Sequence, residues 1–93
     1  AEKGATFERR NPLDGSVATR APAASTADAV AAADAAAEAF KTWKTTGPSE
    51  RRALLLKAAD ALEALTPQFV EAVPAETGAT GMWAGFNVML AAG

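Results

Sequence analysis

The sequence contains no cysteine and no histidine. The absence of cysteine excludes disulfide bonds and thiol chemistry within these 93 residues. Without histidine, the chain lacks the commonest metal ligand and the side chain that most often carries protons near neutral pH. A serine or threonine nucleophile would therefore have no histidine base. We expect no metal site and no catalytic residue in this chain.

Basic residues are missing from the second part of the chain, because Lys57 is the last of them. The formal net charge is −2. A nucleic-acid-binding protein needs a basic face, and an acidic half does not bind anionic lipid. No apolar run reaches transmembrane length and no signal peptide opens the chain. We expect no nucleic-acid or membrane partner and a cytoplasmic location.

Aromatic residues are scarce, at 6% of the chain, whereas alanine dominates. Alanine favours helix but offers little apolar area for burial. A chain of this length also buries only a modest fraction of its surface. The composition therefore predicts a small helical segment whose own core is marginal.

Residues 6–20, TFERRNPLDGSVATR, are predicted to form a β-hairpin. The turn chemistry is Asn11-Pro12 followed by Asp14-Gly15, and the flanking strands alternate only weakly. A lone two-stranded hairpin is barely stable in water, so it must pack on something, which could lie outside this segment. Residues 21–24 are expected to be a linker.

Four helices are expected after the linker, over about 26–46, 48–65, 67–76 and 82–93. Ser25 with Asp28 approximates a capping box at the first start, and Gly47-Pro48 separates the first two helices. The apolar faces are Val30, Ala33, Ala37 and Phe40 in the first helix, and Leu55, Ala58, Leu62, Leu65 and Phe69 in the stretch that follows.

Prolines mark the boundaries of the third helix. Thr66-Pro67 is expected to be a new cap and first turn, which kinks or restarts the helix. Pro74 is expected either to bend that helix or to end it near Val73, because an interior proline costs about 3 kcal/mol. The stretch from Gly78 to Gly81 is interpreted as a turn, being too short and generic for a phosphate-binding loop.

An aromatic stripe occupies the last helix, with Trp83, Phe86 and Leu90 at i, i+3 and i+7. It has two interpretations: core packing, or one wall of a ligand tunnel in which a flat ring stacks on a flat substrate. Asn87, placed among these apolar residues, favours the second. The carboxylates of Asp60 and Glu63 are interpreted as part of a solvated helix face.

Several stretches in fixed order resemble the opening of aldehyde dehydrogenases. FERRNPLDGSVATRAPAA resembles their strand and N-P-x-x-G turn, and an alanine-rich helix ending in A-F-x-x-W is followed by P-x-x-R-R-x-x-L-L-x-K-A-A-D-x-L-E and E-T-G. The match covers nearly the whole chain. The variant ETGAT-x-x-W-A-G-F-N-V is similar to bacterial dehydrogenases of aromatic aldehydes, the salicylaldehyde and vanillin type.

The resemblance implies an α/β parent fold with a Rossmann-like NAD-binding domain. Residues 1–93 would form the N-terminal part of that domain, and the catalytic and oligomerisation domains of the parent protein are absent from this segment. It implies NAD- or NADP-dependent oxidation of an aldehyde to a carboxylate by a homo-dimer or homo-tetramer. The family's catalytic cysteine and glutamate and its cofactor loops lie beyond this stretch, so the segment is expected to be inactive and to bind no cofactor alone.

The resemblance also implies candidate substrate-binding residues in the last helix. Phe86 and Leu90 match the tunnel-facing positions best, with Trp83 and Asn87 as neighbours. The alternative is a free-standing, alanine-rich helical interaction module without catalysis. The residues alone leave both possibilities open.

Overall fold

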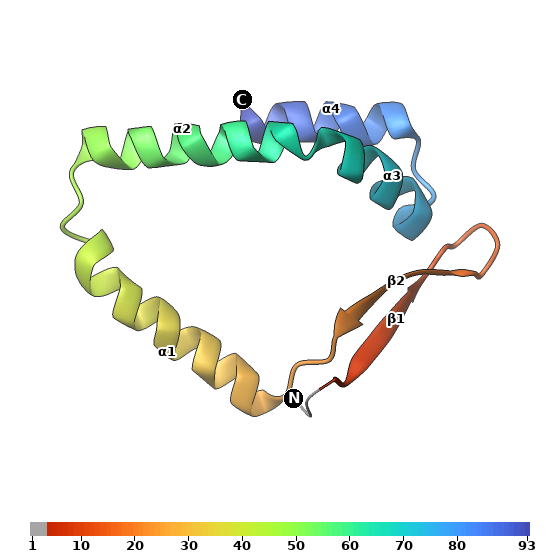
Figure 1. The fold of residues 1–93 in the computed structure, drawn as a ribbon, viewed down its shortest axis with the longest axis horizontal. Helices are drawn as coiled ribbons and strands as arrows, with labels where there is room; N and C mark the ends of the chain where they lie inside the picture. Colours follow the sequence, from red (N-terminus) through yellow and green to blue (C-terminus); the bar gives the residue numbers. More distant parts are fainter. Residues whose placement is uncertain (1–3) are drawn as a thin grey trace.

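The computed structural model describes residues 4–93 as a two-stranded β-hairpin followed by four helices (Figure 1). This order agrees with the expected hairpin and helices. The elements are β1 (Thr6–Arg10), β2 (Val17–Pro22), α1 (Thr26–Trp43), α2 (Pro48–Ala64), α3 (Thr66–Thr77) and α4 (Gly81–Ala92).

The hairpin is held at its tip by local hydrogen bonds. The side-chain carbonyl of Asn11 accepts from the Leu13 amide, and the Asp14 carboxylate accepts from the Ser16 amide, both over 2.9 Å. Gly15 takes a left-handed φ of 74°, which glycine adopts without steric cost. The pairing runs to Pro22, so part of the expected 21–24 linker belongs to β2. Proline is tolerated there because a two-stranded sheet has only edge strands.

Helix α1 begins as expected and ends early. Ser25 and Asp28 form the capping box, with the Asp28 amide donating to the Ser25 hydroxyl and the Asp28 carboxylate accepting from the Ser25 amide. The helix ends at Trp43 rather than near residue 46. Beyond Trp43 the amides of Thr45 and Thr46 bond three residues back, which tightens the chain into a turn before Pro48.

Arg51 fastens the junction between α1 and α2. Its Nε donates to the Thr46 carbonyl and its Nη2 to the Trp43 carbonyl, both over 2.8 Å. The guanidinium also lies 5.0 Å from the centre of the Trp43 ring. The guanidinium thus adds a second hydrogen bond to the Trp43 carbonyl, which already accepts from the Thr46 amide, and places a cation at the C-terminus of α1, where it is favourable.

A break separates α2 from α3, as the Thr66-Pro67 pair predicts. Leu65 leaves helical geometry, with φ −90° and ψ 4°, and serves as the cap of both helices. Thr66 does not act as the expected N-cap, because its hydroxyl donates backward to the Glu63 carbonyl over 2.6 Å.

Helix α3 continues through Pro74 to Thr77, so it does not end near Val73. Proline removes one helical hydrogen bond, and here the loss falls in the last turn. The helix then closes on Gly78, whose φ of 76° is left-handed and whose amide donates to the Pro74 carbonyl over 2.9 Å.

Helices α3 and α4 pack closely because two glycines of α4 face one valine of α3. A Cβ at Gly81 would lie 3.3 Å from Val70 Cγ1, and one at Gly85 would lie 3.7 Å from Val70 Cγ2. Helix α4 returns alongside α2 in the opposite direction (Figure 1). Ala84 and Val88, on α4, are the only buried apolar residues among residues 4–93.

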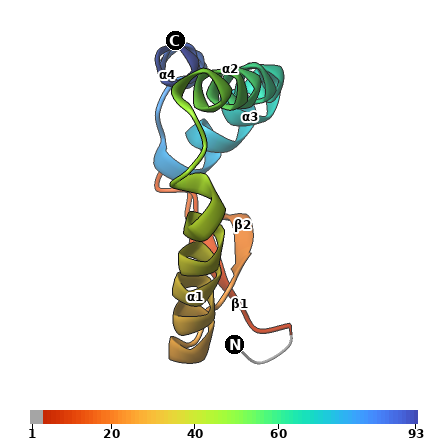
Figure 2. The ribbon, with the colours of Figure 1, turned by 90° about the vertical axis from the view of Figure 1, so that its left-hand side faces the viewer.

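The segment encloses little interior of its own. Its Cα radius of gyration is 17.2 Å, against about 12 Å for a compact domain of this length. It forms a thin curved layer with Cα extents of 49 × 36 × 14 Å, and the view from the side shows this thinness (Figure 2). Apart from the Arg51 contact at its C-terminus, helix α1 packs on no other element within residues 4–93. Large apolar side chains are exposed on every element, among them Phe7, Val30, Leu55, Phe69 and Met82.

Candidate functional site

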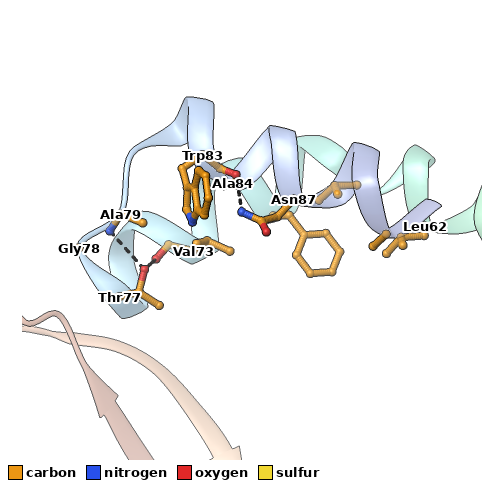
Figure 3. A pocket seen from close by; sticks show the side chains of 11 residues that line it. Leu62, Val73, Thr77, Gly78, Ala79, Trp83, Ala84 and Asn87 are labelled. Atoms are coloured by element: carbon orange, nitrogen blue, oxygen red, sulfur yellow. Dashed lines mark hydrogen bonds between the residues drawn. The ribbon is translucent and has the colours of Figure 1, made fainter. Parts of the chain in front are cut away.

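An open pocket of about 760 Å³ lies between α3 and α4. Leu62 of α2 lies at one end of the pocket, and Gly78 and Ala79, in the turn after α3, lie at the other end (Figure 3). The lining is mainly apolar and consists of Leu62, Phe69, Val73, Thr77, Gly78, Ala79, Trp83, Ala84, Asn87, Val88 and Ala91. A mainly apolar hollow with a few polar groups is the usual form of a small-molecule site.

The α4 wall of the pocket is anchored by a cap that the sequence pattern did not predict. Thr80 is the N-cap, and its hydroxyl accepts from the Trp83 amide over 3.1 Å. Gly81 is therefore the first helical residue, which agrees with a helix start at Gly81 or Met82. The signal was present, because threonine is a preferred N-cap, but no acidic residue three positions later completed a capping box.

Two of the four candidate residues, Trp83 and Asn87, line the pocket. They are one helical turn apart, and the Asn87 side-chain amide donates to the Trp83 carbonyl over 2.8 Å (Figure 3). The Trp83 side chain remains 56% exposed, which leaves much of its ring free to contact a ligand.

The other two candidates, Phe86 and Leu90, are not among the residues that line this pocket. The Phe86 ring lies beside that of Trp83, with centroids 5.8 Å apart and planes tilted by 33°. Phe86 is 43% exposed and Leu90 is 59% exposed. The stripe therefore divides between two sides of α4, and a substrate contact for Phe86 and Leu90 stays a prediction.

The turn wall of the pocket is braced by the hairpin. Glu76 accepts a hydrogen bond from the Thr19 hydroxyl over 2.6 Å, and Arg9 Nε lies 3.8 Å from the same carboxylate oxygen. At Gly78, a Cβ would meet the Pro12 side chain at 3.2 Å, so the hairpin tip packs against the turn. Sequence patterns did not reveal this contact, because Thr19 and Glu76 are 57 residues apart.

The described part of the chain, residues 4–93, holds no group of three or more metal-ligating side chains. None of the helices in that part has the length and hydropathy needed to cross a bilayer.

The sequence profile of the aldehyde dehydrogenase family matches residues 1–93, and the chain belongs to this family. This establishes the resemblance noted in the sequence, and with it the α/β fold of the parent protein.

Similar proteins include dehydrogenases of aromatic aldehydes. The chain is 57% identical to a salicylaldehyde dehydrogenase of Pseudomonas putida, over 89% of this chain and 17% of that protein. It is 58% identical to a vanillin dehydrogenase of Pseudomonas sp. (strain HR199), over 95% of this chain and 18% of that protein.

A solved structure also matches. The crystal structure of a salicylaldehyde dehydrogenase from Pseudomonas putida G7, complexed with salicylaldehyde, superposes with a TM-score of 0.92 at 52% identity. The match covers 99% of this chain and 19% of that one. The chain thus spans less than a fifth of the length of these relatives.

Members of this family use NAD(P), and the glycine-containing turn between α3 and α4 does not fit that cofactor. A dinucleotide phosphate needs a glycine-rich turn whose amides point to it at a free helix N-terminus. At the start of α4, the Trp83 amide is already taken by Thr80, and Gly78 is used to end α3. The turn between α3 and α4 is therefore not assigned to a dinucleotide phosphate.

Proposed function

We propose that residues 1–93 are the N-terminal segment of an NAD(P)-dependent enzyme that oxidises an aromatic aldehyde to a carboxylate. The carrying observation is the apolar pocket with Trp83 on its wall, because an exposed indole face suits a flat aromatic ring. The similarity to salicylaldehyde and vanillin dehydrogenases supports the same substrate class.

In this proposal the segment forms part of the NAD-binding domain and contributes a wall of the substrate tunnel. Trp83 stacks on the substrate ring, Asn87 lies beside it, and Phe86 and Leu90 line the tunnel further along. The nucleophilic cysteine, the water-activating glutamate and the groups that bind NAD or NADP belong to other parts of the enzyme. The enzyme is a cytoplasmic homo-dimer or homo-tetramer.

The exposed apolar surface argues against a free-standing helical module. Helix α4 is apolar on nearly all sides, with Met82 87% exposed and Met89 57% exposed. A helix that is apolar all round is normally buried in a larger protein. We therefore expect residues 1–93 expressed alone to melt with poor cooperativity, as followed by circular dichroism. A sharp, reversible two-state transition would favour the module.

The activity is tested on the complete protein that carries this segment. Reduction of NAD⁺ and NADP⁺ is followed by absorbance with salicylaldehyde and vanillin, and with a short aliphatic aldehyde for comparison. We expect aromatic aldehydes to be oxidised with the higher kcat/KM. Absence of turnover with every aldehyde would contradict the proposal.

The stacking role of Trp83 is tested by Trp83→Ala. An aromatic contact contributes about 0.5–1.5 kcal/mol beyond area burial, so kcat/KM for aromatic aldehydes should fall about 2- to 12-fold more than for aliphatic ones. Trp43→Ala is the matched control, because Trp43 lies at the α1–α2 junction and does not line the pocket. An equal loss for both substrate classes in Trp83→Ala would remove the stacking role.

A further inference from the structure

The pocket has three side chains with polar atoms, Thr77, Trp83 and Asn87. The Thr77 hydroxyl is already engaged, because it donates to the Val73 carbonyl over 2.7 Å and accepts from the Ala79 amide over 3.2 Å. Figure 3 shows both bonds at the end of the pocket formed by the turn after α3. Thr77 therefore has no proton left to donate to a ligand.

Asn87 presents an acceptor. Its Nδ2 donates to the Trp83 carbonyl over 2.8 Å, and this bond also settles which end of the amide is the oxygen. The reversed amide would place two acceptors against each other, so the nitrogen must face the carbonyl. Oδ1 is left with no hydrogen bond to any atom of residues 4–93. In Figure 3 it projects from α4 on the same side as the Trp83 ring.

Trp83 presents the opposite polarity. Its indole nitrogen is a donor only, and it makes no hydrogen bond within the described residues. In Figure 3 this nitrogen points from α4 toward the end of α3. The apolar pocket thus offers one fixed acceptor, one donor and a ring face within a single helical turn.

We propose that Asn87 is a specificity-determining residue that selects aromatic aldehydes bearing a ring hydroxyl, whose proton it accepts at Oδ1. This rests on the proposed function for the reaction, but the recognition itself is a binding event. Asn87 is exposed in this segment, but a ring that covers Oδ1 without donating to it removes its water and leaves the acceptor unpaired, which is costly, so a ring without a donor binds less well. A methoxy group at the same ring position is equally disfavoured, because it has no proton to give.

The test compares the complete protein with its Asn87→Leu variant, which keeps the side-chain size and removes the acceptor. Substrates are the three monohydroxybenzaldehydes, their methoxy counterparts and benzaldehyde. In the parent protein we expect the hydroxylated series to contain the best substrate. In Asn87→Leu its kcat/KM relative to benzaldehyde should fall about 2- to 12-fold, the range of a single neutral hydrogen bond. Ser16→Ala, in the hairpin turn, is the control that leaves this ratio unchanged.

A second measurement does not require turnover. Binding of phenol and of toluene to the complete protein is followed by isothermal titration calorimetry. We expect Asn87→Leu to weaken phenol binding by the same factor and to leave toluene binding unchanged. An unchanged phenol affinity, or an equal loss for both ligands, overturns the role of Asn87. If the complete protein turns over no aldehyde but still binds phenol more tightly than toluene through Asn87, the proposed reaction is overturned and the role of Asn87 stands.

Discussion

Glu76 joins the hairpin to the end of α3, so replacing it tests whether the docking depends on this carboxylate. The Thr19 hydroxyl donates to it over 2.6 Å in a part-buried setting. A hydrogen bond to a charged acceptor contributes about 1.5–3 kcal/mol. Arg9 contributes less, because its side chain is 51% exposed and its Nε lies 3.8 Å away. We expect Glu76→Ala to weaken docking by about 1.5–3 kcal/mol.

A graded variant separates the charge from the hydrogen bond. Glu76→Gln keeps an acceptor for Thr19 and loses the charge. A neutral hydrogen bond contributes about 0.5–1.5 kcal/mol, so this variant should lose about half as much as Glu76→Ala. We expect the hairpin to dock most strongly in the parent protein, less strongly in Glu76→Gln and least strongly in Glu76→Ala.

The assay is amide hydrogen exchange of β1 and β2 in the complete protein. Each 1.4 kcal/mol corresponds to about a tenfold change in an opening equilibrium, so Glu76→Ala should raise hairpin exchange about 10- to 150-fold. Glu8→Gln is the control, because Glu8 pairs with Arg10 and Arg20 inside the hairpin. Unchanged hairpin exchange in Glu76→Ala would refute the reasoning and assign the docking to the apolar contacts at the hairpin tip.

Three further predictions concern a helix, a junction and a turn. Gly85→Ala should stabilise the protein by about 0.5–1 kcal/mol, because glycine is unfavourable in the middle of a helix. The added Cβ would meet Val70 Cγ2 at 3.7 Å, an ordinary contact distance. The midpoint of denaturant unfolding measures this change in stability. Arg51→Lys should cost about 1–3 kcal/mol in the same assay, because lysine lacks the planar fork that reaches the carbonyls of Trp43 and Thr46 together. Arg52→Lys should cost nearly nothing. The Ser16 hydroxyl, and then its amide, lower the pKa of Asp14 below the ordinary 3.8. This stabilisation is complete above 3.8 and is lost as the pH falls through the lowered pKa, so exchange at Gly15 should accelerate there in the parent but not in Asp14→Asn.

Local chemistry could be read from the sequence where neighbouring residues determine the backbone. Ser25 with Asp28, and Pro48 after glycine, predict helix starts because the capping partners lie within one turn. The same reasoning failed at Thr66, whose hydroxyl turns back to Glu63. A hydroxyl at a helix junction can donate to a carbonyl of the preceding helix or accept from an amide of the following one. The sequence spacing of the residues does not decide between these two hydrogen bonds.

Features that depend on distant residues could not be predicted in this way. The contact of Thr19 with Glu76 has no periodic signature, because it joins a strand to a helix. Likewise, periodicity groups Trp83 with Phe86, whereas the pocket groups Trp83 with Asn87. Which side of α4 becomes a pocket wall is decided by where α3 packs, and that follows from the valine at position 70 facing the glycines of α4.

The thinness of the segment changes what exposure means for its residues. A Cα thickness of 14 Å corresponds to about two packed helices, so among residues 4–93 only Ala84 and Val88, where α4 meets its neighbours, are buried within this layer. Leu55, at 63% exposed, would be judged a tolerant surface position on that number alone. The matching segment is under a fifth of the length of the salicylaldehyde dehydrogenase relative, so under the proposed function such positions should behave in mutational scans as interior sites, where Leu→Ala costs about 2–5 kcal/mol.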